Sequence, residues 1–327
     1  MQRRRFNAWI AAAPWAATST ARAEAGYRDL QWTDSRRGRD LPLRLRWPVG
    51  DGPCALVIFS HGLGGNLQAG TVWADAWQAA GFAVLNLQHP GSDDTIWADR
   101  LRGVRRGAQA DQYLARAADA RFVLDELERR RDEPGWRRVR LDAIGFSGHS
   151  FGARLTQALA GEAAPGRGAA GARGPLADPR PKAFAAFSPG FADRAGDVAT
   201  AARQHFGAID RPFLCLTGTE DESMIVGDAS NAARRAVYDG LPPGARAELV
   251  LDGADHMTFG GQALPRRAAR GPLKRVDTAV QREAQHRAAI AAITTDWWRW
   301  RLLGDAAAAE RLQRPAGLAA GDRWRLG

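Results

Sequence analysis

Two serines lie three positions apart in a glycine-rich stretch, AIGFSGHSFGARL, which spans residues 143 to 155. A serine hydroxyl becomes a useful nucleophile where a base takes its proton, commonly a histidine that a carboxylate holds in place. Gly148 and Gly152 lie two positions on either side of Ser150, which gives the G-x-S-x-G pattern of a strained strand-to-helix turn. Ser147 lacks such a pair, since residue 149 is a histidine. The pattern therefore predicts Ser150 as the nucleophile.

The ends of two later apolar runs supply a base and an acid. The run AELVLDGADHM reaches His256, and the run PFLCLTGTED reaches Asp221. Ligands of an α/β sheet lie beyond the carboxyl ends of its strands, and the chain order serine, acid, histidine is the one such a site requires. We predict His256 as the general base and Asp221 as its partner. Glu220 and Asp193 remain alternatives for the acid.

A second glycine-rich stretch, FSHGLGGN, could provide amides for a negatively charged oxygen. One N–H is expected from the residue after the nucleophile, Phe151, and one from the loop after the first central strand, at Leu63. The stretch is not a dinucleotide loop, because Leu67 occupies the place of the third glycine of G-x-G-x-x-G. His61 is expected to hold this loop by hydrogen bonds, and His149 to pack beside the serine.

Apolar runs alternate with helical patterns along the chain that must position these residues. The runs are ALVIFSH, FAVLNLQH, RLDAIGF, KAFAAFS, PFLCLTG and AELVLDG. Continuous apolar runs of this kind indicate parallel strands that are covered on both faces, whereas YRDLQWTD and LPLRLRWP alternate as an antiparallel hairpin would. The sequence therefore predicts an α/β fold with a mostly parallel sheet of about eight strands, an N-terminal hairpin and helices on both faces. Cys54 and Cys215 lie within such runs, and we expect both to be buried free thiols.

The 327 residues are expected to form one main domain over 24–303, with a mobile excursion rich in Gly, Ala and Pro at 161–181. A tail at 304–327 is expected to be a weak helix with a loose end. The first 23 residues have a basic start at 3–5, a weakly apolar middle and the small-x-small triplet Ala-Arg-Ala at 21–23. They predict an export signal of the twin-arginine type, and hence a periplasmic or secreted protein.

Composition excludes several classes of protein. The formal charge is +10, but the arginines are interleaved with acids, and the sequence contains no zinc-finger, RNP or P-loop pattern. No nucleic-acid partner is therefore expected. No apolar run approaches the roughly 20 residues of a membrane helix, so no integral membrane segment is predicted in the mature chain.

Four motifs, FSHGLGGN, LNLQHPGSD, GHSFGA and GADHMTFGG, together resemble the α/β-hydrolase superfamily. The combination of HGLGG with GHSFG resembles dienelactone-hydrolase-like bacterial proteins related to platelet-activating-factor acetylhydrolase, over about residues 55 to 261. The resemblance implies an α/β-hydrolase fold and a serine esterase that uses Ser150 and His256, with Leu63 and Phe151 as oxyanion donors. Acetylhydrolases of that type carry their acid where this chain has Ser188, and dienelactone hydrolases proper use a cysteine as the nucleophile, so neither substrate specificity carries over.

The resulting prediction is a carboxylic ester hydrolase that forms an acyl-serine intermediate and acts on a small-molecule or lipid ester without a cofactor or metal. Trp97 and Phe191 could line the substrate pocket, or could anchor their own loops. The alternatives are a hydrolase of another acyl substrate, such as a lipid, polyester or lactone, and a binding module that has lost the chemistry.

Overall fold

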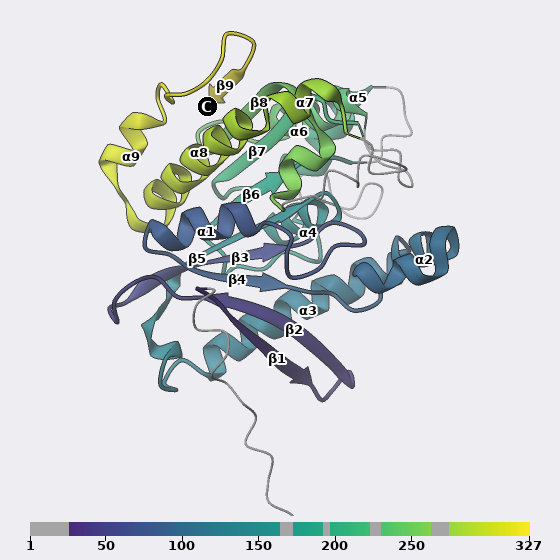
Figure 1. Cartoon of the computed structure of the whole chain (residues 1–327), viewed down its shortest axis with the longest axis vertical. Coiled ribbons are helices and arrows are strands. Elements are labelled where there is room, and N and C mark those ends of the chain that lie inside the picture. The colour runs from purple at the N-terminus through teal and green to yellow at the C-terminus, as the bar shows by residue number, and fades with distance from the viewer. Residues whose placement is uncertain (1–25, 164–172, 192–196, 223–229, 263–274) are drawn as a thin grey trace, which may run out of the picture.

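A computed structural model describes residues 26–163, 173–191, 197–222, 230–262 and 275–327 (Figure 1). The predicted export signal and residues 164–172 of the predicted excursion lie outside this part of the chain, so both features stay predictions. Within the described residues, no helix is long and apolar enough to cross a membrane.

A nine-stranded sheet in the order β1-β2-β4-β3-β5-β6-β7-β8-β9 forms the centre of the molecule. Its parallel strands are β3 (Cys54–Ser60), β4 (Ala83–Leu87), β5 (Val139–His149), β6 (Ala183–Phe187), β7 (Phe213–Glu220) and β8 (Arg246–Asp255). The antiparallel strands are β1 (Arg28–Asp34) and β2 (Arg39–Arg46) at one edge and β9 (Arg323–Leu326) at the other. The predicted mostly parallel sheet with an N-terminal hairpin is confirmed.

Helices cover both faces of the sheet, as Figure 1 shows. One face carries α3 (Ala110–Arg129), α4 (Phe151–Ala160), α5 (Val198–Phe206) and α6 (Asn231–Gly240), and the other carries α1 (Thr71–Ala79) and α8 (Glu283–Leu303). Strand β3 serves both faces, because Leu56 and Ile58 pack with the first set of helices and Val57 and Phe59 with the second. This is why the run CALVIFS is apolar at nearly every position.

Shorter elements complete the chain, namely η2 (Asp94–Asp99), α2 (Arg100–Gly107), η3 (Trp136–Arg138), η4 (His256–Gly260), α7 (Asp277–Gln281) and α9 (Ala306–Arg311). The tail does not end as the loose segment that the sequence predicts. Strand β9 pairs with β8, and Trp324 donates its indole N–H to the carbonyl of Leu312 at 2.7 Å. The tail therefore closes one edge of the sheet. Cys54 and Cys215 are both buried and free, as expected.

Candidate active site

Ser150 lies in the sharp turn between β5 and α4, with backbone angles of φ 56° and ψ −113°. This conformation is strained for a residue with a side chain. The two flanking glycines make the turn possible, because a Cβ on Gly152 would lie 2.1 Å from the carbonyl oxygen of Ser60 and one on Gly148 would lie 2.5 Å from that of Gly152. The amide of Ser150 donates to the carbonyl of Phe187 at 2.9 Å, which ties the turn to β6.

Ser147, the other serine of this stretch, faces the interior of the protein. It is fully buried in β5, and its hydroxyl donates to the carbonyl of Ile58 at 2.9 Å. Its environment is that of a structural residue.

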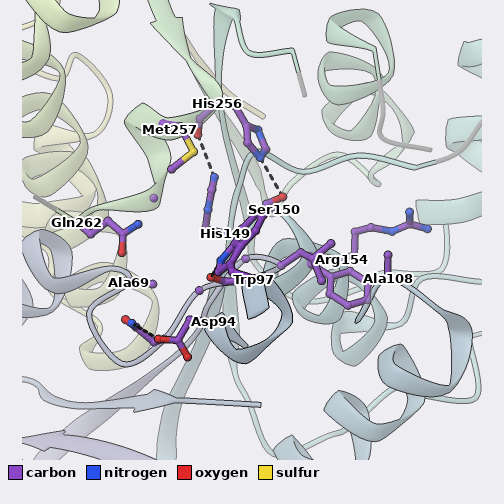
Figure 2. Close-up of a pocket in the computed structure, with 17 residues that line it drawn as sticks. Ala69, Asp94, Trp97, Ala108, His149, Ser150, Arg154, His256, Met257 and Gln262 are labelled. Carbon is purple, nitrogen blue, oxygen red and sulfur yellow. Dashed lines mark hydrogen bonds between the residues drawn. The ribbon is translucent and has the colours of Figure 1, made fainter. Parts of the chain in front are cut away.

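A continuous chain of hydrogen bonds joins Ser150, His256 and Asp221. Nε2 of His256 lies 2.9 Å from Oγ of Ser150, and its Nδ1 lies 2.8 Å from Oδ1 of Asp221 (Figure 2). Asp221 follows β7, and His256 follows β8, so both come from the same edge of the sheet as the serine turn. The sequence predicted these three residues, and the structure brings them together.

Asp221 is completely buried, and His256 is one of several partners of its carboxylate. Its carboxylate also accepts from the hydroxyl of Thr217 at 2.8 Å and lies 3.3 Å from the guanidinium of Arg234. Burial alone would raise the pKa of Asp221, but the charge of Arg234 and the hydrogen bond from His256 outweigh it and hold the pKa well below its usual range. The carboxylate is therefore ionised at neutral pH and accepts a hydrogen bond from Nδ1–H of His256.

The rival acid Glu220 does not share this position. Glu220 is exposed at the end of β7, opposite Asp255 on β8. Asp193 lies outside the described residues.

His149 supports the backbone of His256. Its Nε2–H donates to the carbonyl oxygen of His256 at 3.0 Å, and the two rings lie 4.7 Å apart. Burial, reinforced by the neighbouring His256, lowers the pKa of His149 to about 3. His149 is therefore neutral at physiological pH and adds no positive charge beside the histidine that faces the serine.

The two predicted oxyanion donors lie beside the serine. Leu63 and Phe151 both line the pocket that contains Ser150. Phe151 is the first residue of α4, where backbone amides have no acceptor within their own helix. Gly62 brings the other loop close, since a Cβ at Gly62 would lie 3.4 Å from the Cβ of Ser150.

The pocket has a volume of about 340 Å³, near the lower end of the range for small-molecule sites. Its apolar wall includes Leu63, Trp97, Phe151 and Met257, and its polar lining includes Asp94 and Arg154 (Figure 2). The sequence analysis missed Arg154 and Met257. Each could have been found from its place in the chain, because Arg154 lies one helical turn after Ser150 and Met257 directly follows His256.

Trp97 lines the pocket as predicted, and Phe191 does not. The indole N–H of Trp97 donates to the carbonyl of Gly64 at 2.8 Å, so this ring also anchors the loop that carries Leu63. Phe191 is only 1% exposed and packs against His205 and Phe206 in the core under α5. Phe191 has apolar partners in the core, and its ring packs there. The possible role of Phe191 in the pocket is therefore wrong.

A second serine, histidine and aspartate set lies next to the loop that carries Leu63. Nε2 of His89 is 3.0 Å from Oγ of Ser60, and its Nδ1 is 3.0 Å from Oδ2 of Asp119. All three residues have no exposed surface, so no substrate can reach this serine. Arg37 and Arg39 also bind Asp119, each with an N···O distance of 2.8 Å. This set is therefore a structural network.

Three buried histidines predict a loss of stability in mild acid. Burial lowers the pKa of His149 to about 3, that of His89 to about 4, and that of His61 well below 6.5. In the unfolded chain each histidine binds a proton below about pH 6.5, whereas in the folded protein each stays neutral to a lower pH. Each group should therefore lower the free energy of unfolding by about 1.4 kcal/mol per pH unit as the pH falls from about 6 towards 4.5.

Urea unfolding at several pH values measures this slope. His149→Gln removes the titrating ring and retains an amide donor. We therefore expect the free energy of unfolding to depend less steeply on pH, by about the contribution of one proton. Buried carboxylates with depressed pKa values, Asp119 and Asp221, add stability that is lost at still lower pH. An identical slope in the variant and the wild type would contradict the assignment of a neutral His149.

Comparison with known proteins supports the fold. Searches against protein families and curated proteins give no match to this sequence. Among solved structures, the chain is similar to the crystal structure of the 2,6-dihydroxy-pseudo-oxynicotine hydrolase, with a TM-score of 0.51 and 17% sequence identity over 85% of this chain and 68% of the other. The strand order and this likeness together show an α/β-hydrolase fold. Among the described residues, no group of three His, Cys, Asp or Glu side chains is arranged to hold a metal ion.

Proposed function

We propose that this protein is a serine hydrolase that cleaves carboxylic esters through an acyl-serine intermediate. The observation that carries the proposal is the hydrogen-bonded chain from buried Asp221 through His256 to Ser150, at the base of a pocket that can hold a small molecule. The similar solved structure is that of a hydrolase, which agrees with the proposal.

The first half of the reaction forms the acyl-enzyme. Oγ of Ser150 attacks the ester carbonyl carbon while Nε2 of His256 takes the hydroxyl proton, and the carbonyl π electrons move to the oxygen. The ionised carboxylate of Asp221 stabilises the imidazolium that forms. The N–H groups of Leu63 and Phe151 would receive the negative oxygen. The tetrahedral intermediate then collapses, and the leaving alcohol departs with the proton from His256.

The second half releases the acid. Water attacks the acyl-serine carbonyl as His256 takes one of its protons, and collapse of the new tetrahedral intermediate returns that proton to Oγ of Ser150. His149 is neutral, so its ring, 4.7 Å from that of His256, does not repel the positive charge that forms on the imidazolium.

The lining of the pocket favours esters with short acyl groups. A volume of about 340 Å³ must hold both the acyl and the alcohol portions near Ser150. Apolar walls at Leu63, Trp97 and Met257 suit a hydrocarbon group.

A panel of p-nitrophenyl esters with acyl chains of increasing length tests the proposal on the purified protein. We expect hydrolysis well above the buffer rate, with short chains cleaved fastest. Preference for long chains would favour a lipid or polyester substrate, and activity confined to cyclic esters would favour a lactone. Absence of hydrolysis across esters and lactones would support the binding-module alternative.

A further inference from the structure

A buried arginine contacts the loop that carries Leu63. Arg116 of α3 has no exposed surface, and its guanidinium donates to the carbonyls of His61 at 2.6 Å, Gly62 at 3.3 Å and Ser92 at 3.1 Å. Its Nε donates to the hydroxyl of Ser92 at 2.8 Å. None of these acceptors carries a full charge. The nearby carboxylates of Asp119 and Asp93 attract this buried cation, while its hydrogen bonds go to residues 61 and 62 and to Ser92.

The carbonyl of Gly62 has donors besides Arg116. It accepts from Arg116, from the amide of Gly65 at 3.1 Å and from Nδ1 of His61 at 2.6 Å. The tautomer of His61 follows from its other nitrogen, because Nε2 accepts the backbone N–H of His89 at 3.0 Å and Nδ1 must therefore carry the proton. Three donors thus fix the direction of one carbonyl.

A fixed Gly62 carbonyl also fixes the next amide. The peptide group is planar and trans, and the C=O of Gly62 points opposite to the N–H of Leu63 within that plane. Because the Gly62 carbonyl points towards Arg116, the Leu63 N–H points away from Arg116. Leu63 and Ser150 line the same pocket, where an ester oxygen would lie.

We propose that Arg116 is a positioning residue which, with His61, aims the Leu63 N–H at the developing oxyanion and strengthens it as a donor. A hydrogen bond from a cation to the carbonyl polarises the peptide group and makes its N–H a better donor. Arg116 also lies 4.6 Å from the centre of the Phe151 ring, so it contacts one residue whose amide we assign to the oxyanion and, through the Gly62 carbonyl, the peptide group that contains the other amide. The inference rests on the proposed esterase function.

Paired ester and thionoester substrates provide a readout specific to these amides. In a thionoester, sulfur replaces the carbonyl oxygen and accepts hydrogen bonds weakly. Loss of oxyanion donors should slow the oxygen ester far more than the thionoester, whereas general loosening of the site should slow both. We expect Arg116→Lys to lower kcat for the oxygen ester about 10-fold or more with little change in KM, and to lower the ester-to-thionoester ratio of kcat/KM.

Arg121 offers a matched control on the same helix. Its guanidinium donates to the carbonyls of Pro175 at 3.0 Å and Ala177 at 3.3 Å, away from the pocket. Arg121→Lys should therefore leave the ester-to-thionoester ratio at its wild-type value.

Two variants of His61 independently test whether the orientation of the Gly62 carbonyl affects oxyanion binding. They decide whether the inference holds if Arg116→Lys does not fold. The amide nitrogen of asparagine can take the place of Nδ1, and that of glutamine the place of Nε2. His61→Asn should therefore keep a donor to Gly62 and stay closer to the wild-type ratio than His61→Gln.

The outcomes separate the inference from the function on which it rests. A lowered ratio in Arg116→Lys or His61→Gln, with Arg121→Lys unchanged, supports the inference. A wild-type ratio in every folded variant, with ester hydrolysis still dependent on Ser150, overturns the inference and leaves the proposed function intact. A wild-type protein without Ser150-dependent hydrolysis overturns both.

Discussion

Ser150→Ala is expected to lower kcat/KM for a cleaved ester by about 10⁴-fold or more. The variant removes the only atom that can form the acyl-serine in our mechanism, while the turn, the pocket and the oxyanion amides remain. Steady-state kinetics on a p-nitrophenyl ester from the panel measure the loss.

Ser147→Ala is the matched control for this experiment. Ser147 lies three residues earlier, within β5, and its hydroxyl donates to the carbonyl of Ile58 in the buried sheet. We expect activity close to wild type and a loss of about 1 kcal/mol in the free energy of unfolding. Equal activity in Ser150→Ala and the wild type would contradict the catalytic role of Ser150.

Asp221→Asn is expected to lower kcat by about 10⁴-fold. The neutral amide cannot stabilise the His256 imidazolium, and it no longer fixes the proton on Nδ1, 2.8 Å away. It also removes the negative charge that lies 3.3 Å from the guanidinium of buried Arg234. Circular dichroism must therefore accompany the kinetics, to show that the variant is folded.

Two other carboxylates serve as controls for the identity of the acid. Glu220→Gln changes an exposed neighbour of Asp221, and Asp193→Asn changes the alternative acid after β6. Both should retain activity. Full activity in Asp221→Asn, together with its loss in either of the others, would contradict our assignment.

Much of the fold follows from local patterns in the sequence. Strands β3, β4 and β6 are buried at every position and are almost entirely apolar, so they are easily recognised. Strand β9 has only four residues, RWRL, and two of them are arginines. Its position depends on pairing with β8, about 70 residues earlier, and local sequence contains no sign of such a contact.

The candidate site was predictable where chemistry demands a fixed spacing. The glycines around Ser150 prevent backbone clashes at 2.1 and 2.5 Å, so the turn has a readable pattern. Phe191 was misplaced because an aromatic residue after a strand fits a pocket and a core equally well. Arg116 could have been suspected, because it precedes Ala120 by four residues and Val123 by seven and thus falls on the buried face of α3.

Covalent trapping tests the central claim most directly. The wild-type protein, Ser150→Ala and Ser147→Ala are each incubated with a fluorophosphonate, and the intact mass and the modified peptide are measured. Our account predicts one adduct per chain on Ser150 in the wild type and in Ser147→Ala, with unmodified protein in Ser150→Ala. Equal labelling of Ser150→Ala, or an adduct mapped to another residue, would contradict the claim that Ser150 is the nucleophile.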